Sequence, residues 1–374
     1  MARVILLAAA LARSATALRP AVPRMASRQR PAPLRMAFTP GVDKTDEKVT
    51  IVGASGYIGK AVVRECVRRG YDTTAVTRPQ SSLTFDGATT ARAESENLND
   101  ITQCFKDAQT QVVICCLASR SGTEADSLKV DYEASVNCLK AAQACGARHF
   151  VLLSAFCVAK PDLGFQVAKL KTEAALKNQD QVTWTSVRPT AFFKSLSGQV
   201  EIVRGGGPFV YFDLGGGRSA TCNPISEADL AMAIVDCVAD PSRSSNGGEP
   251  IWNVGGPDAG VSMKRQGELI ADAIAAVDGG ERKEPWLLPV PIGVFDGIVG
   301  AIKWVYDLTG ADSVRDAWEL GKIGRYYAVE DMLTTADAER YGAMSLREHY
   351  ENVAKNGQEY DPYTTVFAKN PLIK

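Results

Sequence analysis

The sequence predicts an α/β fold built on a doubly wound parallel sheet, with a smaller C-terminal substrate-binding region. Between residues 49 and 190, short apolar or β-branched runs alternate with stretches of helical period. A glycine-rich turn separates the first such run from the first helical stretch. Alternating strands and helices imply parallel strands joined by right-handed crossovers. This pattern is typical of a Rossmann-like dinucleotide-binding fold.

The individual elements are predicted in order along the chain. The β-branched run at 49–52 forms the first strand, and apolar residues then recur at helical spacing until Gly70 ends the helix. Later, continuous apolar runs indicate strands that are buried on both faces. The remaining predicted strands cover residues 73–78, 112–119, 149–156 and 182–190, and the later predicted helices cover 130–146, 168–179 and 226–240.

The first 42 residues form a targeting leader rather than part of this fold. They contain seven arginines and no acidic residue, and residues 4–12 are apolar. An apolar run followed by a stretch rich in Arg, Ser, Ala and Pro is typical of a signal sequence joined to a plastid transit peptide. We therefore expect a plastid protein, in a plastid of secondary endosymbiotic origin. A single mitochondrial or plastid presequence is the alternative.

Composition restricts the classes of partner and cofactor. Removing the seven arginines of the leader takes the net charge from −1 to about −8, and a mildly acidic protein is not expected to bind nucleic acid. The nine cysteines are scattered, and the chain has only two histidines. These counts favour buried free thiols and predict neither a metal site nor a disulfide framework.

A glycine-rich loop is the strongest functional signal. The segment GASGYIG, residues 53–59, has the spacing GxxGxxG and lies directly after a strand and before a helix. Glycines in such a loop let backbone N–H groups approach a pyrophosphate at the helix N-terminus. The expected dinucleotide contacts are Gly53, Ser55, Gly56, Tyr57, Ile58 and Gly59.

The end of the second strand indicates which dinucleotide binds. An NAD site usually has an acidic residue there for the ribose hydroxyls, whereas this chain has Thr77, Arg78 and Pro79. A guanidinium pairs with a 2′-phosphate that a carboxylate would repel. We therefore predict NADPH as the cofactor, with Arg78 and either Ser55 or Ser81 at its phosphate.

Two later strand ends are expected beside the nicotinamide, because parallel sheets bind ligands at the carboxyl ends of their strands. The residues expected there are Leu117, Ala118, Ser119, Pro189, Thr190 and Phe192. On this basis residues 43–195 form the NADPH-binding core. Residues 196–374 form the substrate-binding region, with interleaved sheet elements and a C-terminal tail.

Further motifs carry a family resemblance. Ser154 lies in the run LLSA, and Lys169 follows fifteen residues later, which resembles the atypical short-chain dehydrogenases of the NmrA-like group. Four longer blocks resemble the plant-type divinyl chlorophyllide 8-vinyl reductases, over a match from Val49 to about Leu333. The blocks are CLASRSG, HFVLLSAFCVAKP running into FQVAKLKTEAAL, VRPTAFFKSLSGQVEIV and GKIGRYYAVEDML.

The resemblance implies an NADPH-dependent enzyme that reduces the 8-vinyl group of divinyl chlorophyllide or protochlorophyllide to ethyl in chlorophyll biosynthesis. It also implies a plastid location, in agreement with the leader. Two other functions stay open. One is a non-catalytic NADPH-binding assembly factor for photosynthetic complexes. The other is a reductase of another conjugated double bond, similar to the isoflavone-reductase-like enzymes.

The tyrosine expected of a short-chain dehydrogenase is absent. Carbonyl-reducing members use Tyr-x-x-x-Lys, whereas here Phe165 lies four residues before Lys169, and none of the eleven tyrosines has a lysine four residues later. A carbonyl needs an acid at the oxygen that collects charge, but charge from hydride addition to a vinyl group spreads over the conjugated macrocycle. We expect Lys169 to hold the nicotinamide ribose, Phe165 to form an apolar wall, and Ser154 to remain a polar contact.

Three roles have several candidates. Tyr211, Tyr326 and Tyr327 are candidate proton donors. Lys194 or Arg325 would pair with the propionate of a chlorophyllide. The apolar segment 285–308 fits a core helix with its lead-in loop, the lining of a hydrophobic pocket, or a peripheral contact with the thylakoid membrane.

Overall fold

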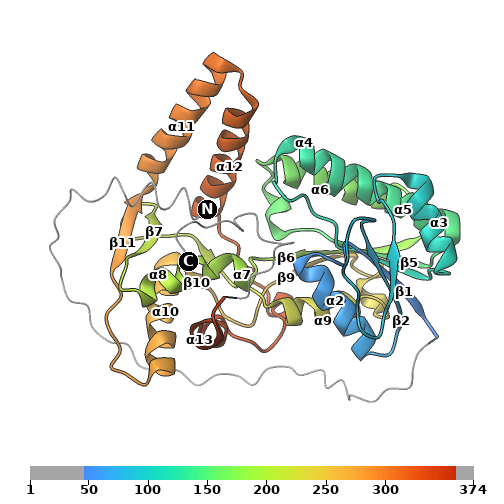
Figure 1. The fold of residues 1–374 in the computed structure, drawn as a ribbon, viewed down its shortest axis with the longest axis horizontal. Coiled ribbons are helices and arrows are strands. Elements are labelled where there is room, and N and C mark those ends of the chain that lie inside the picture. Colours follow the sequence, from blue (N-terminus) through green and yellow to red (C-terminus); the bar gives the residue numbers. More distant parts are fainter. Residues whose placement is uncertain (1–45, 359–374) are drawn as a thin grey trace.

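A seven-stranded parallel sheet forms the centre of the computed structural model, which describes residues 46–358 (Figure 1). The predicted leader and the predicted tail lie outside the described residues. The strand order is β3-β2-β1-β4-β5-β6-β9, and every neighbouring pair is parallel. The strands are β1 (Lys48–Val52), β2 (Asp72–Thr77), β3 (Thr89–Arg92), β4 (Val112–Cys115), β5 (His149–Leu153), β6 (Thr183–Pro189) and β9 (Ile251–Val254). The order reverses between β1 and β4, so the predicted doubly wound, Rossmann-like fold is confirmed.

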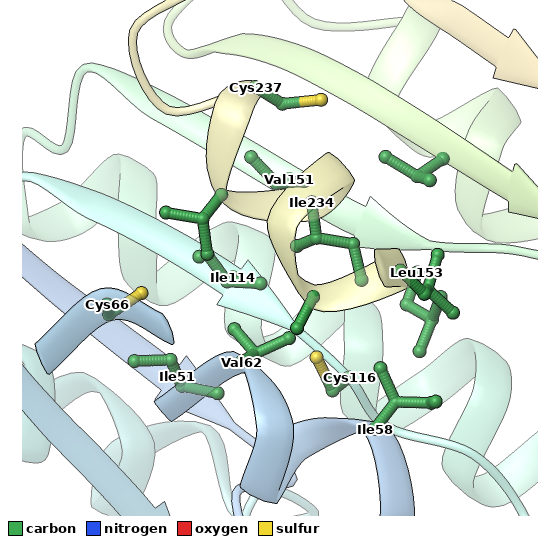
Figure 2. Packing of buried hydrophobic residues seen from close by; sticks show 14 of the residues in the cluster. Ile51, Ile58, Val62, Cys66, Ile114, Cys116, Val151, Leu153, Ile234 and Cys237 are labelled. Atoms are coloured by element: carbon green, nitrogen blue, oxygen red, sulfur yellow. The ribbon is translucent and has the colours of Figure 1, made fainter. Parts of the chain in front are cut away.

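Helices cover both faces of this sheet. One face packs against α2 (Tyr57–Arg68) and α9 (Glu227–Asp236), where Figure 2 shows Ile51, Ile114 and Ile234 meeting. The opposite face packs against α3 (Leu98–Asp107), α5 (Ser135–Cys145) and α6 (Gly164–Lys177). Successive strand residues point to opposite faces, so Ile51 belongs to the first core and Val52 to the second. This arrangement explains why β4 and nearly all of β5 are apolar on both faces.

Two central strands are shorter than predicted. The strands expected over 112–119 and 149–156 end at Cys115 and Leu153. Both apolar runs continue past the strands because Cys116 is buried after β4, and Ala155 and Phe156 are partly buried in an apolar cluster after β5. Hydrophobicity therefore overestimates strand length at the carboxyl edge of the sheet, where the chain turns away to form loops.

The C-terminal region adds two small sheets and a second core. β7 (Phe209–Asp213) pairs in parallel with β11 (Leu287–Pro291), and β8 (Thr221–Cys222) pairs antiparallel with β10 (Val261–Ser262). α10 (Met263–Asp278) packs against α13 (Leu346–Asn356). The chain beyond residue 195 also contributes α9 and β9 to the main sheet layer. The shorter elements are α4 (Glu124–Ser127), η2 (Leu128–Ala134), η3 (Phe156–Ala159), α7 (Phe193–Leu196), η4 (Ser197–Gln199), α8 (Val200–Arg204), η5 (Pro241–Arg243) and η6 (Asp337–Glu339).

A helical hairpin projects from the body and is called the arm below (Figure 1). It consists of α11 (Ile292–Thr309) and α12 (Asp312–Val329), which lie side by side. A Cβ at Gly321 would lie 3.2 Å from Val299 Cγ2, so this glycine permits a close approach of the helices. Only Phe295 and Val299 of α11 are buried, so this segment is not a plain core helix. Within residues 46–358, no helix has both the length and the apolar character needed to cross a bilayer.

Candidate active site

The glycine loop forms the predicted turn between β1 and α2. Gly53 has φ +77°, and a Cβ there would lie 2.8 Å from the carbonyl oxygen of Cys116. A Cβ at Gly59 would lie 2.1 Å from the carbonyl oxygen of Gly53. Gly56 precedes α2 and has no side chain to cap its first N–H groups. The loop therefore fits an anionic dinucleotide bound at the N-terminus of α2.

The predicted phosphate end of the site contains a second arginine. Arg78 directly follows β2 and is exposed. Arg92 is the last residue of β3 and lies in register with Thr77 of β2. Its guanidinium donates to Thr77 Oγ1 at 2.5 Å and to the Leu83 carbonyl at 3.1 Å. Sequence reasoning missed Arg92 because it lies in a stretch without a recognisable motif. Its position at the end of a strand beside β2 becomes visible only from the strand order.

Lys169 lies on α6, is buried, and has one hydrogen-bond acceptor and one ion-pair partner. Its Nζ donates to the Leu153 carbonyl at 3.1 Å and lies 3.0 Å from Asp131 Oδ1. Asp131 Oδ2 accepts the Ser119 N–H at 3.1 Å, so the end of β4 is attached to the same carboxylate. Of the predicted nicotinamide contacts, Leu117, Ala118 and Ser119 thus lie on a segment connected to Lys169 through Asp131. Nothing in the sequence pattern indicated Asp131.

Ser154 belongs to a buried carboxylate network. Its hydroxyl donates to Glu173 Oε1 at 2.6 Å, and the same oxygen accepts from Ser186 Oγ at 2.8 Å and Arg188 Nε at 3.0 Å. Burial raises the pKa of Glu173, but the hydrogen bonds from Arg188 and Ser154 outweigh it and hold this pKa below its usual value. Glu173 therefore stays ionised and accepts the hydrogen bond of the Ser154 hydroxyl. Ser154 thus makes a polar contact within the protein, to Glu173, in this structure.

The residues after β6 meet the glycine loop. The Phe192 ring lies 6.2 Å from the Tyr57 ring, and Lys194 Nζ lies 4.9 Å from the centre of the Tyr57 ring. The Tyr57 hydroxyl donates to Glu227 Oε2 at 2.6 Å. Thr190, which follows Pro189 at the end of β6, is buried and donates to the Asn223 carbonyl at 2.7 Å. The fold thus brings two predicted cofactor segments, 53–59 and 189–192, together.

Phe165 lies in an apolar cluster that joins the two regions of the protein. The cluster combines the 156–163 segment and the start of α6 with the end of α12. Phe165 is partly buried there, close to Cys157 and to the adjacent residues Tyr326 and Tyr327. Phe165 thus lies among apolar side chains, and its role as a wall against the ligand stays a prediction.

The cysteines take no part in a metal cluster. All nine lie in the described part of the chain and are free thiols, and seven of them are buried. Among the described residues, no group of three or more His, Cys, Asp and Glu side chains is placed to bind a metal.

Comparison with known proteins identifies the family. Residues 53–241 match a family model described as NAD(P)H-binding. The divinyl chlorophyllide a 8-vinyl-reductase of Cucumis sativus is 39% identical over 369 residues, which cover 88% of this chain and 84% of the relative. The enzyme of the same name from Oryza sativa subsp. indica is 39% identical over 364 residues, covering 90% and 86%. The chain belongs to the divinyl chlorophyllide a 8-vinyl-reductase family.

The family assignment confirms the predicted resemblance and the predicted nicotinamide cofactor. A solved NADPH-dependent quinone oxidoreductase from Escherichia coli, complexed with NADPH, superposes with a TM-score of 0.57. It covers 82% of this chain and 99% of its own at 16% identity, which bears on the fold alone. Both reductases named above are described as chloroplastic.

The GKIGRYYAVEDML block of this reductase family member lies in the second half of α12 and the residues after it. The Tyr326 hydroxyl donates to the carbonyls of Cys157 and Lys160, at 3.0 and 2.9 Å, and burial raises its pKa to about 12. Tyr327 belongs to the Phe165 cluster, with its hydroxyl 4.0 Å from Cys157 Sγ. Tyr211 packs in a different core, with α10 and α13. Two of the three candidate proton donors, Tyr326 and Tyr327, belong to the Phe165 cluster. Of these two, only Tyr327 has a hydroxyl that is not hydrogen-bonded to a backbone carbonyl.

The two candidate partners of a propionate also differ. The Arg325 guanidinium pairs with Asp296 at 2.5 Å and connects α12 to α11 at the arm. Lys194 lies over the Tyr57 ring, beside the glycine loop. The geometry therefore favours Lys194 over Arg325 for contact with a ligand at the carboxyl edge of the sheet.

Replacing Arg78 tests the expected selectivity for NADPH. Because a charge-assisted hydrogen bond contributes about 1.5–3 kcal/mol, Arg78→Ala should weaken NADPH binding roughly 10- to 100-fold and leave NADH binding within about twofold. Binding is measured by titration of nucleotide fluorescence. Arg64→Ala on α2 is the matched control, and equal weakening of both nucleotides by Arg78→Ala would contradict a phosphate contact.

Proposed function

We propose that the protein reduces the 8-vinyl group of divinyl chlorophyllide or protochlorophyllide to ethyl with NADPH, as a plastid enzyme of chlorophyll biosynthesis. The observation that carries the proposal is Phe165 beside a buried Lys169 in a chain 39% identical to named reductases over most of its length. Such a site lacks the phenol that a carbonyl reductase uses. It is suited to a substrate whose own π-system takes up charge.

In this proposal some of the described residues position the cofactor, and others exclude water from the substrate. NADPH supplies the hydride when it is bound. Lys169 has three N–H donors. The Leu153 carbonyl accepts one of them and Asp131 Oδ1 pairs with the charge at 3.0 Å, and we assign a remaining donor to the nicotinamide ribose. Phe165 presents an apolar wall that favours a flat macrocycle over water. Because negative charge spreads over the macrocycle, no oxyanion requires an acid at hydrogen-bond distance.

A direct assay tests this function. The protein without its leader is incubated with NADPH and divinyl chlorophyllide or divinyl protochlorophyllide, and products are separated by chromatography and identified by absorption. Stoichiometric monovinyl product and NADPH oxidation are expected. Binding of NADPH without any product from either tetrapyrrole would favour an assembly factor. Turnover of another conjugated double bond alone would favour the isoflavone-reductase-like alternative.

Restoring the missing phenol tests the assignment of Phe165. Because the delocalised intermediate does not need an acid at this position, Phe165→Tyr should leave kcat within about threefold of the original value. Phe165→Leu serves as the control for loss of the aromatic wall. A tenfold increase in kcat with Phe165→Tyr, about 1.4 kcal/mol off the barrier, would show that proton delivery at this position is limiting.

We assign delivery of the proton to Tyr327. A proton must reach the inner vinyl carbon after hydride addition to the terminal carbon. Burial raises the pKa of Tyr327, so this phenol remains protonated through neutral pH. It shares the apolar cluster with Phe165, and its hydroxyl contacts only the soft sulfur of Cys157 among the described residues. These features support a donor that becomes available to the macrocycle.

Two neighbouring tyrosines make a matched test of this assignment. General acid catalysis contributes typically 10²- to 10⁴-fold, so Tyr327→Phe should lower kcat by about 10²-fold. Tyr326→Phe removes hydrogen bonds to two carbonyls and should cost about 0.5–1.5 kcal/mol of stability, with kcat within about threefold. Steady-state kinetics and thermal unfolding separate the two effects. Equal kinetic losses in both variants would exclude Tyr327 as the specific donor.

The arm is our proposed contact with the thylakoid membrane. On α11, Phe295 and Val299 are buried toward α12, while Val294, Trp304 and Leu308 are 48%, 64% and 65% exposed. The exposed residues recur at helical spacing and form an apolar stripe that continues to the end of α11. A helix with such a stripe lies in the interface plane of a bilayer, with its tryptophan at headgroup level.

Substitutions in the stripe test membrane binding. Full burial of a large apolar side chain contributes about 1.5–3 kcal/mol. Trp304→Asp combined with Leu308→Asp should therefore reduce co-flotation with neutral phosphatidylcholine vesicles at least tenfold. Leu98→Asp, at an exposed position at the start of α3, is the control. Binding that persists in the double variant, or that disappears at 0.5 M salt in the unmodified protein, would contradict an apolar contact by the arm.

A further inference from the structure

Asp131 is a buried carboxylate that pairs with Lys169. It is 2% exposed and lies in η2, a π-helical segment between α4 and α5. Burying an ion pair costs several kcal/mol of desolvation for each charge, so such pairs contribute little to stability compared with apolar residues of similar volume. π-Helical turns are rare and often occur at functional sites. The buried charge and the π-helical turn are both more typical of a functional position than of a purely stabilising one.

The carboxylate oxygens of Asp131 have different partners. Oδ1 lies 3.0 Å from Lys169 Nζ on α6. Oδ2 accepts the backbone N–H of Ser119 at 3.1 Å, just after β4. The main-chain carbonyl of Asp131 accepts from Thr172 Oγ1 at 2.7 Å, which attaches η2 to the same helix that carries Lys169. Asp131 therefore links three segments that come from distant parts of the sequence.

These contacts determine the direction of the Lys169 ammonium. Lys169 lies on α6, and its flexible side chain has many rotamers in an open environment. Here the Leu153 carbonyl accepts one of its three N–H donors, and Asp131 Oδ1 pairs with its charge at 3.0 Å. These two oxygens hold the Nζ between them and so restrict the position of the ammonium. The segment of Leu117 to Ser119, which we expect beside the nicotinamide ribose, is bonded to the other oxygen of the same carboxylate.

We propose that Asp131 is a positioning residue of the reductase site, which acts through Lys169 to orient the nicotinamide ribose. This inference rests on the proposed function for the identity of the reaction, but its test reads nucleotide binding directly. Asp131 does not itself touch the reacting atoms. The negative charge of Asp131 compensates the buried Lys169 ammonium. The hydrogen bond from the Ser119 N–H holds the carboxylate in position beside Lys169.

The variant Asp131→Asn separates charge from shape. Asparagine retains an oxygen that accepts the Ser119 N–H but removes the negative charge facing Lys169. Asp131→Asn should weaken NADPH binding at least tenfold, as measured by nucleotide fluorescence without tetrapyrrole. Lys169→Met should have a similar effect. If Asp131 acts through Lys169, the double variant Asp131→Asn/Lys169→Met should bind NADPH no more weakly than Lys169→Met alone.

Two further variants distinguish positioning from general stability. Asp131→Glu keeps the charge but displaces it by one methylene. Its affinity for NADPH should therefore lie between that of the unmodified protein and that of Asp131→Asn. Glu65→Gln is the matched control, because Glu65 is also a buried carboxylate, paired with Arg69 on α2 at 2.6 Å. It should lower the thermal unfolding temperature and leave NADPH affinity within twofold.

The outcomes decide for or against the proposal. NADPH affinity within twofold of the unmodified value in folded Asp131→Asn would overturn it, as would additive losses in the double variant. Should Asp131→Asn fail to fold, the comparison of Asp131→Glu with Glu65→Gln decides, and unchanged affinity in Asp131→Glu overturns the proposal. If Asp131 governs NADPH affinity but no vinyl group is reduced, the proposed function fails while this inference stands.

Discussion

The buried ion pair between Lys169 and Asp131 is the interaction on which the geometry of the site depends. Each charge is expensive to bury, and each becomes tolerable only because the other lies 3.0 Å away. The pair holds α6 against η2, and through Ser119 it also holds the segment that follows β4. A neighbouring network around Glu173 connects α6 to β6 through Arg188 and Ser186. Together these polar contacts set the position of α6 at the carboxyl edge of the sheet.

The C-terminal region meets this edge through the family-specific block on α12. A Cβ at Gly122 would lie 2.9 Å from Ile323 Cδ1, and the Glu124 N–H donates to Glu319 at 2.7 Å. Tyr326 then bonds to the carbonyls of Cys157 and Lys160, which follow β5. These contacts hold a block that is far from the glycine loop in the sequence against the segments around Gly122 and Cys157.

Much of the fold follows from local signals in the sequence. The glycine spacing predicts the β1–α2 turn because a Cβ at Gly59 would collide with the Gly53 carbonyl. The helix over Glu227–Asp236 lies within the predicted range 226–240 and begins after Ser226, whose Oγ accepts the Asp229 N–H. Strand ends were less predictable, since loop residues such as Cys116 and Phe156 pack against apolar clusters and extend the apolar runs beyond the last paired residues of the strands. The apolar segment around α11 was ambiguous for a related reason: hydropathy does not reveal whether a helix is covered.

The sequence by itself determined the sheet, the nucleotide-binding loop, the family and the substitution of Phe165 for the usual tyrosine. These features depend on residues that are adjacent or regularly spaced, so the chain displays them directly. Only the tertiary structure decided that Asp131 faces Lys169, that Glu173 occupies Ser154, and that Arg92 lies beside the end of β2. Each of these contacts joins segments brought together by strand order and helix packing. No local period encodes such a pairing, because it arises only when the separate elements are folded onto one sheet.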